Sequence, residues 1–257
     1  MKKLNKNSVV LWEGPSELDG KPIVLILTGL KNDSDNDKTG AMRQTFILRR
    51  DISPKAAVYS GEDRSICGDC RHRLRLWDDG KEVRTCYVNI GKSVRSVYEA
   101  YRRGRYGYAT KEDVAKIRDG LLRLGTYGDP AAVPFGVWKL LLRGRKREHT
   151  GYTHQWRNPT IDPRMQSIVM ASADSEQERE HAHSLGWRTF EVRPLGSGPG
   201  VGFQCPSDAT LPKEKIVKCE NCKACHGAPN GTRPKSPWIY AHGPSGKRVG
   251  ALSHAIL

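Results

Sequence analysis

A regular alternation of strand-like and helix-like segments between about residue 85 and residue 193 is the feature that most constrains the fold. The strand-like segments are short apolar or β-branched runs bounded by turn residues, and the helix-like segments repeat apolar residues at intervals of three and four. Such alternation is typical of parallel strands joined by right-handed helical crossovers. The sequence therefore predicts an α/β fold.

The number of predicted strands narrows this fold class further. Strands are expected at residues 21–30, 44–49, 85–90, 121–127, 150–156, 167–172, 188–193 and 237–242, and helices at residues 53–60, 93–103, 110–120, 134–142 and 175–185. This number of strands favours a complete or partial (β/α) barrel, with a doubly wound open sheet as the alternative. We expect residues 1–195 to form the barrel-like domain and residues 196–257 to form a Cys-rich metal-binding segment that closes the same domain.

Seven cysteines form two groups along the chain. Their number is odd, and the opening Met1-Lys2-Lys3 precedes no apolar run of the kind that a secretory signal needs. We therefore expect a cytoplasmic protein, with no disulfide framework and no membrane span. Metal binding is the better explanation for this set of thiols.

The group near the carboxyl end carries the stronger metal signal. It consists of Cys205, Cys219, Cys222 and Cys225. Three cysteines at successive x2 spacings can wrap a tight loop around a cluster, and together with a remote Cys-Pro they match the ferredoxin-type pattern for a [4Fe–4S] cluster. Four thiolates also satisfy a closed tetrahedral zinc site, but zinc more often uses two separate Cys-x2-Cys pairs. The spacing leans towards iron–sulfur.

The earlier group has three thiols, Cys67, Cys70 and Cys86, with His72 close to the first pair. Three interpretations stay open. The group is a zinc site completed by His72, a [4Fe–4S] cluster with one open iron of the kind that catalysis needs, or a structural feature in which Cys67 and Cys70 stabilise a loop and Cys86 lies in a buried strand.

Polar residues stand at the ends of several predicted strands. Asp129 follows the strand at 121–127, His154 lies late in the strand at 150–156, and Asp174 follows the strand at 167–172. In parallel α/β folds the chemistry gathers at the carboxyl ends of the strands, so these three residues are the catalytic candidates. The plainer interpretation makes Asp129 and Asp174 helix caps and His154 a core histidine.

The formal net charge of +15 indicates a polyanionic partner, most often nucleic acid. Mixtures of Arg and Tyr suit phosphate contact and base stacking, although basic residues also occur as solvated helix ends. The candidate nucleic-acid contacts lie in two basic runs: Arg102, Arg103, Arg105 and Tyr106, and Arg143, Arg145, Lys146 and Arg147.

An ordered set of short motifs resembles a family of phage and plasmid proteins and, more distantly, the phage gene-product-eighty-eight family. The motifs are SICGDC at 65–70, CYVN at 86–89, YGDP at 127–130, GYTHQW at 151–156 and MAS at 170–172, followed by the Cys-rich segment. His154 stands where the gene-product-eighty-eight pattern has an arginine. Both families are similar to barrel enzymes of the radical S-adenosylmethionine type.

This resemblance implies particular roles for the cysteines. In radical S-adenosylmethionine enzymes three cysteines hold a [4Fe–4S] cluster whose open iron binds the cofactor, and some members carry an auxiliary four-cysteine cluster near the carboxyl end. The resemblance thus assigns the catalytic cluster to the earlier cysteines and cofactor contacts to Tyr87, Asn89 and Ser172. The usual Cys-x3-Cys-x2-Cys spacing is absent, and a charged insertion separates Cys70 from Cys86.

Two functions are therefore expected from the sequence. The first is a phage- or plasmid-type iron–sulfur protein, a radical S-adenosylmethionine-like enzyme acting on or near nucleic acid. The alternative is a non-enzymatic, zinc-stabilised nucleic-acid-binding protein with a role in replication or regulation.

Overall fold

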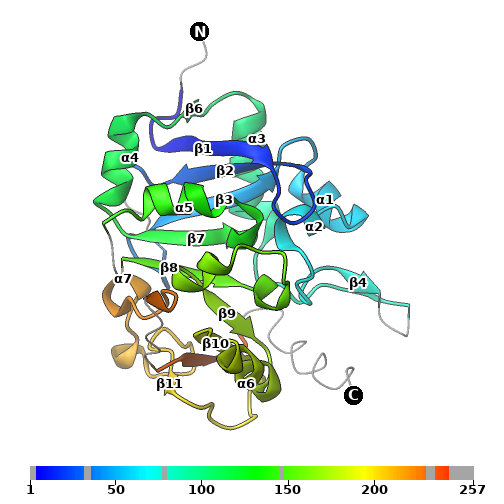
Figure 1. Ribbon diagram of the computed structural model, residues 1–257, viewed down its shortest axis with the longest axis vertical. Helices are drawn as coiled ribbons and strands as arrows, with labels where there is room; N and C mark the ends of the chain where they lie inside the picture. The colour runs from blue at the N-terminus through cyan, green and yellow to red at the C-terminus, as the bar shows by residue number, and fades with distance from the viewer. Residues whose placement is uncertain (1–3, 32–35, 77–79, 145–147, 230–234, 243–257) are drawn as a thin grey trace.

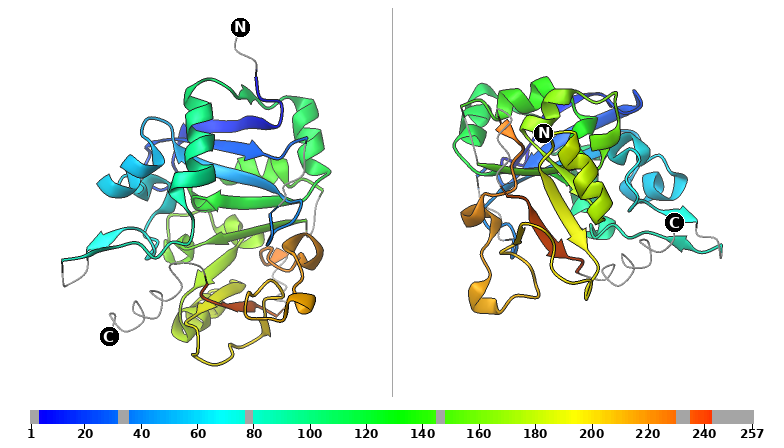
Figure 2. Two further views of the ribbon diagram at one scale, coloured as in Figure 1. Left: turned by 180° about the vertical axis from the view of Figure 1, so that it is seen from behind. Right: turned by 60° about the horizontal axis from the view of Figure 1, so that its bottom comes forward.

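One ten-stranded sheet organises the chain, with strand order β11-β12-β10-β9-β8-β7-β3-β2-β1-β6. The computed structural model describes residues 4–31, 36–76, 80–144, 148–229 and 235–242. The helix α3 covers one face of the sheet and the helix α5 covers the opposite face (Figures 1 and 2). The sheet therefore forms the middle layer of the fold.

Most neighbouring strands of this sheet are parallel; the antiparallel pairs are β1 with β2 and β2 with β3. The strands are β1 (Ser8–Pro15), β2 (Pro22–Thr28), β3 (Arg43–Arg49), β6 (Gly107–Tyr108), β7 (Leu122–Tyr127), β8 (His149–Thr153), β9 (Met170–Ala173), β10 (Thr189–Arg193), β11 (Phe203–Gln204) and β12 (Pro237–Tyr240). A separate short hairpin joins β4 (Arg75–Leu76) to β5 (Glu82–Val83).

Three of the seven α-helices in the described residues begin at a side chain that accepts a hydrogen bond from a free backbone N–H group. The seven are α1 (Pro54–Ser60), α2 (Arg64–Cys67), α3 (Arg95–Arg102), α4 (Lys111–Arg118), α5 (Phe135–Leu141), α6 (Glu176–Ser184) and α7 (Cys219–Cys222). Ser53 caps α1, Thr110 forms a capping box with Asp113 at α4, and Ser175 caps α6. These caps place three helices where the sequence predicts them.

The expected α/β class is confirmed by this large, mostly parallel sheet. The seven strands from β3 through β11 in the sheet order run parallel to one another. The strands β6 and β11 stand at opposite ends of the order, and within the described residues no pairing joins them. The described strands therefore form an open sheet, and closure into a barrel is not observed.

One predicted strand, at residues 85–90, is wrong. Residues 85–89 have no regular secondary structure, and the short strand nearby is β5. The Arg84 side chain donates hydrogen bonds to the carbonyls of Cys86 (3.2 Å) and Val88 (2.9 Å). Because that guanidinium occupies carbonyl oxygens that a partner strand would need as hydrogen-bond acceptors, the segment folds as a loop.

The central strands are buried on both faces, which explains their continuous apolar sequence. Ile23, Leu25 and Leu27 in β2 have no exposed surface, and neither has Trp138 of α5. The Trp138 indole donates a hydrogen bond of 2.9 Å to the carbonyl of Pro130. The described part of the chain contains no helix with the length and apolarity that a membrane span requires.

Candidate metal centre at the carboxyl edge of the sheet

The carboxyl ends of neighbouring parallel strands bring two candidate residues together. His154 directly follows β8 and Asp174 directly follows β9, and these strands pair in parallel. A loop from elsewhere in the chain closes over them: the Gln155 side chain donates a hydrogen bond to the Cys67 carbonyl (2.9 Å). The same loop carries His72, which therefore reaches the ends of β8 and β9.

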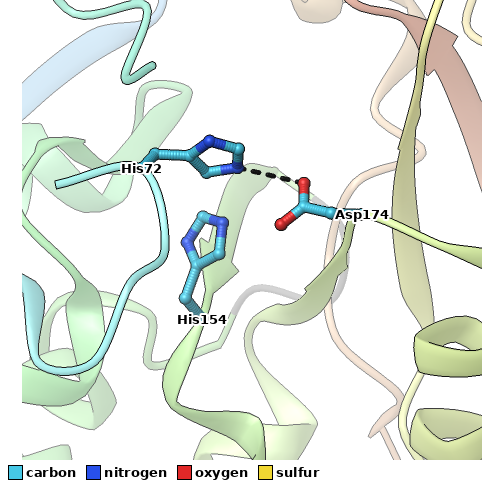
Figure 3. A group of neighbouring side chains, drawn as sticks. All are labelled: His72, His154 and Asp174. Carbon is cyan, nitrogen blue, oxygen red and sulfur yellow. Dashed lines mark hydrogen bonds and ion pairs between the residues drawn. The ribbon is translucent and has the colours of Figure 1, made fainter. Parts of the chain in front are cut away.

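His72, His154 and Asp174 form a compact group at this edge (Figure 3). The His72 Nε2 atom lies 3.0 Å from Oδ1 of Asp174, and the two imidazole rings meet edge to face with centroids 5.3 Å apart. One ligand atom from each residue can be chosen so that all three lie within 4.8 Å of one another. Two imidazoles and a carboxylate at such separations form a donor set that a divalent metal can use.

The carboxylate of this group is buried and favours its charged form. Asp174 is 6% exposed. Burial acts to raise the pKa of Asp174, but the charge of His72 and its hydrogen bond outweigh burial, so the pKa falls to about 2. The Asp174 backbone N–H donates to the Glu178 carboxylate (2.8 Å), which also pairs with Arg71 and Arg157. The hydrogen bond to Glu178, together with the ion pairs of Glu178, therefore fixes the position of Asp174.

Asp129, the third catalytic candidate, binds backbone groups next to the site. Its Oδ1 accepts a hydrogen bond from the Ala131 backbone (2.9 Å), and its Oδ2 accepts one from the His154 backbone (2.8 Å). Burial raises the pKa of the Asp129 carboxyl. Both oxygens thus serve backbone groups, which makes Asp129 a cap that positions His154.

The three cysteines of the earlier group lie next to this edge. The Cys86 backbone N–H donates to the His72 carbonyl (3.0 Å), and the Cys70 backbone N–H donates to the Cys67 carbonyl (3.2 Å). Burial raises the pKa of all three thiols, that of Cys70 to about 11. Without a metal these thiols stay protonated at neutral pH, and a bound metal would stabilise the thiolates.

The four later cysteines line one cavity together with Thr150. Backbone hydrogen bonds hold this segment to β12, from Cys205 to Trp238 (2.7 Å), and to the loop between β2 and β3, from Cys219 to Lys38 (3.0 Å). Between Cys222 and Cys225 the chain reverses at Lys223, a residue other than glycine with a positive φ of 52°. All seven cysteines are free thiols.

The two cysteine groups occupy opposite edges of the sheet. The helix α7, which carries Cys219 and Cys222, lies beside the amino-terminal ends of β7 and β8, whereas the loop leading to β4 lies beside the carboxyl-terminal ends of β7 and β9 (Figure 1). Any group bound by one set of cysteines is therefore separate from any group bound by the other.

The three residues assigned to cofactor binding have different positions. Ser172 is buried in β9, two residues before Asp174 and hence on the same side of the strand. The Tyr87 hydroxyl accepts a hydrogen bond from Arg123 (2.7 Å), and the Asn89 side chain accepts one from the Gly91 backbone (2.8 Å). Tyr87 and Asn89 are exposed and have these local roles, whereas Ser172 lies in the strand that leads to Asp174.

The residues assigned to nucleic-acid contact are mostly exposed. Arg102, Arg103, Arg105 and Arg143 are all exposed, and the Arg102 guanidinium donates to the carbonyls of Arg50 (2.8 Å) and Asp51 (3.2 Å). Tyr106 is half-buried against the hydrophobic core. The remaining candidates lie outside the described residues: Arg145, Lys146 and Arg147.

His72 is the site residue whose role sequence reasoning missed. The sequence suggests it only as a fourth ligand beside the cysteines, whereas its ring nitrogens face Thr85 and Asp174. Its position two residues after Cys70 is the signal that could have indicated a ligand. No family model, curated protein or solved structure matches the chain, so the function has to be inferred from this geometry.

Proposed function

We propose that this protein is an iron–sulfur enzyme whose reaction takes place at the carboxyl edge of the sheet. Cys67, Cys70 and Cys86 would hold a [4Fe–4S] cluster with one iron free of protein ligands. The four later cysteines would hold an auxiliary or structural cluster at the opposite edge. On this proposal the parallel strands from β3 to β11 act as the partial (β/α) barrel of a phage- or plasmid-type cytoplasmic protein.

The observation that carries the proposal is the convergence of three thiols with a His–His–Asp group. Cys70 lies close enough to His72 and Asp174 for their charges to influence its pKa, after the larger effect of burial. Cys86 is hydrogen-bonded through its backbone to His72. A purely structural metal needs no such neighbours, whereas a reaction site does.

The positions of the thiols are compatible with an iron–sulfur cluster, whose ligands stand farther apart than those of zinc. With Zn–S bonds of 2.3 Å at tetrahedral angles, zinc holds thiolate sulfurs about 3.8 Å apart. In the described part of the chain, His72, His154 and Asp174 can bring three ligand atoms within 4.8 Å of one another. The cysteine sulfurs of the described residues form no group that compact. An iron–sulfur cubane does not require its ligand sulfurs to lie within that limit.

Several residues would shape the bound cluster. Gln155 fixes the loop of the first two thiols, since its side chain binds the Cys67 carbonyl and the Asp69 backbone N–H (3.3 Å). Arg84 fixes the Cys86 carbonyl and places positive charge near that thiol. Once reduced by an external one-electron donor, a cluster with an open iron would supply the electron and the binding position for reductive cleavage of S-adenosylmethionine, which is the specific chemistry that we propose.

Metal and sulfide analysis after anaerobic purification tests the proposal. Two clusters give a brown protein with about seven to eight irons and a matching amount of acid-labile sulfide per chain. Cys86→Ser should remove about half of the iron, and Cys222→Ser should remove the other half. A colourless protein that carries one or two zinc ions and no sulfide would overturn the proposal.

S-adenosylmethionine binding is tested separately on the reduced protein. Its addition should change the electron paramagnetic resonance signal of wild-type protein and of Cys222→Ser, but leave that of Cys86→Ser unchanged. An unchanged spectrum in the wild type would remove the radical chemistry while leaving the iron–sulfur assignment in place.

The second candidate is a zinc-stabilised nucleic-acid-binding protein. The exposed Arg103, Arg105 and Arg143 favour it, because such side chains contact phosphates and release counterions. Salt titrations against single- and double-stranded DNA and RNA should show affinity that falls steeply with salt. Arg105→Gln should lower the slope by about 1. A flat salt dependence would count against phosphate contact in either candidate.

A further inference from the structure

We propose that His72, His154 and Asp174 form a mononuclear site for a divalent transition metal, distinct from both cysteine groups. The inference goes beyond the proposed iron–sulfur function and does not require it. The three residues contribute two imidazole nitrogens and one carboxylate oxygen, and they leave further coordination positions open (Figure 3).

The separations suit a metal of ordinary bond length. Donors bound at about 2.1 Å to one metal stand about 3.0 to 3.4 Å apart for octahedral and tetrahedral angles. His72 Nε2 and Asp174 Oδ1 already stand 3.0 Å apart, and the third donor completes a set within 4.8 Å. A bound metal would replace the hydrogen bond between these two atoms and draw the His154 donor closer to them.

Unpartnered buried atoms give a second, independent reason for a ligand here. His154 Nε2 and Asp174 Oδ2 are both buried atoms without a hydrogen-bond partner. Buried polar atoms are nearly always paired, so two unpaired atoms in one small group call for an explanation. A metal ion bound between the side chains would satisfy both.

Each donor residue is also held in place by a contact that does not use its metal-facing atom. The His72 Nδ1 atom lies 2.8 Å from the Thr85 hydroxyl, which orients the ring so that Nε2 faces Asp174. Asp129 holds the His154 backbone, and Glu178 holds the Asp174 backbone. Metal-ligating histidines typically have such a partner on the second ring nitrogen.

The donor set indicates the class of metal. Imidazole nitrogens suit zinc and iron, whereas calcium and magnesium prefer oxygen ligands. Two histidines, one carboxylate and open positions are the arrangement of catalytic zinc sites and of non-haem Fe²⁺ sites. The site therefore fits Zn²⁺ or Fe²⁺ with room for a water or a substrate oxygen.

Co²⁺ is a suitable probe because its spectrum distinguishes nitrogen and oxygen ligands from thiolates. We would titrate anaerobically purified full-length protein, with its cysteine-bound metals in place, and follow calorimetry and visible absorption together. The expected result is one bound Co²⁺ per chain with weak visible bands and no intense near-ultraviolet sulfur-to-cobalt band. Asp174→Asn and His154→Ala should each weaken binding by at least about 10-fold.

Matched variants make the test specific. Asp162→Asn and His181→Ala change an aspartate and an exposed histidine away from the group and should bind Co²⁺ like the wild type. Circular dichroism and the unfolding midpoint of His154→Ala are measured alongside, because the substitution also removes the ring that meets His72 edge to face. Loss of binding in a folded variant then reports the metal site.

Three outcomes would overturn the inference. The first is the absence of saturable Co²⁺ binding, and the second is an equal loss of binding in the control variants. The third is an intense sulfur-to-cobalt band that disappears in Cys70→Ser, because that band would mean that the thiols share the metal. Iron and sulfide measured on the same samples report the cluster proposal independently. Low iron with one Co²⁺ still bound through His154 and Asp174 would reject the clusters and keep this site.

Discussion

Replacement of Asp129 by asparagine isolates the residue that positions His154. The wild-type carboxylate accepts two backbone hydrogen bonds, from Ala131 at 2.9 Å and from His154 at 2.8 Å, and the side chain is buried. An asparagine oxygen can replace one acceptor, but its NH₂ group would face the second N–H. One charge-assisted hydrogen bond is lost and one buried donor is left unpaired.

The expected cost of Asp129→Asn is about 2–3 kcal/mol, since a hydrogen bond to a charged group contributes about 1.5–3 kcal/mol. Urea unfolding followed by tryptophan fluorescence should show a midpoint lower by about 1 M at an unchanged slope. The variant should also weaken Co²⁺ binding, because the His154 backbone is no longer held.

Asp162 provides a matched control because it too precedes a proline and caps a short helix. Its Oδ1 accepts from the Arg164 backbone at 2.9 Å, but the side chain is 26% exposed and pairs with the Arg164 guanidinium. Asp162→Asn should cost less than about 1 kcal/mol, because water replaces what is lost. Equal destabilisation by the two substitutions would refute the argument that Asp129 is a buried positioning residue.

Two further predictions concern the sheet and its Cys-rich end. Gly128 has φ of +82°, and an added Cβ would lie 2.7 Å from Ile47 Cβ, so Gly128→Ala should cost about 2–4 kcal/mol in urea unfolding. Gly20→Ala, with a similar φ and open space, should cost about 1 kcal/mol. Burial acts to raise the pKa of Asp208, but hydrogen bonds, first from the Tyr240 backbone, lower it below its ordinary value. The stability from this group is complete above the unfolded value of about 3.9 and is lost as pH falls through the lower folded value. Asp208→Asn should therefore be less stable at pH 7 and show a shallower decline in stability as pH falls below about 4; an unchanged slope in that range would contradict this.

The local pattern of the sequence was sufficient to predict much of the fold. Continuous apolar runs predicted β2 and β3, and the caps at Ser53, Thr110 and Ser175 predicted three helices. These features depend on residues that are close together in the sequence, so a single sequence is sufficient to predict them. The strand predicted at 85–90 failed because the Arg84 side chain, rather than a partner strand, takes up its carbonyls.

The sequence by itself determined which residues stand at strand ends, since alternation of strand and helix places His154 and Asp174 at the carboxyl edge of a parallel sheet. It could not determine what these residues face. The loop that carries His72 reaches them through hydrogen bonds between residues more than 80 positions apart, such as Gln155 with Cys67. Only the tertiary structure decided that His72 joins His154 and Asp174, and that Asp129 supports them, because those contacts depend on how distant segments pack.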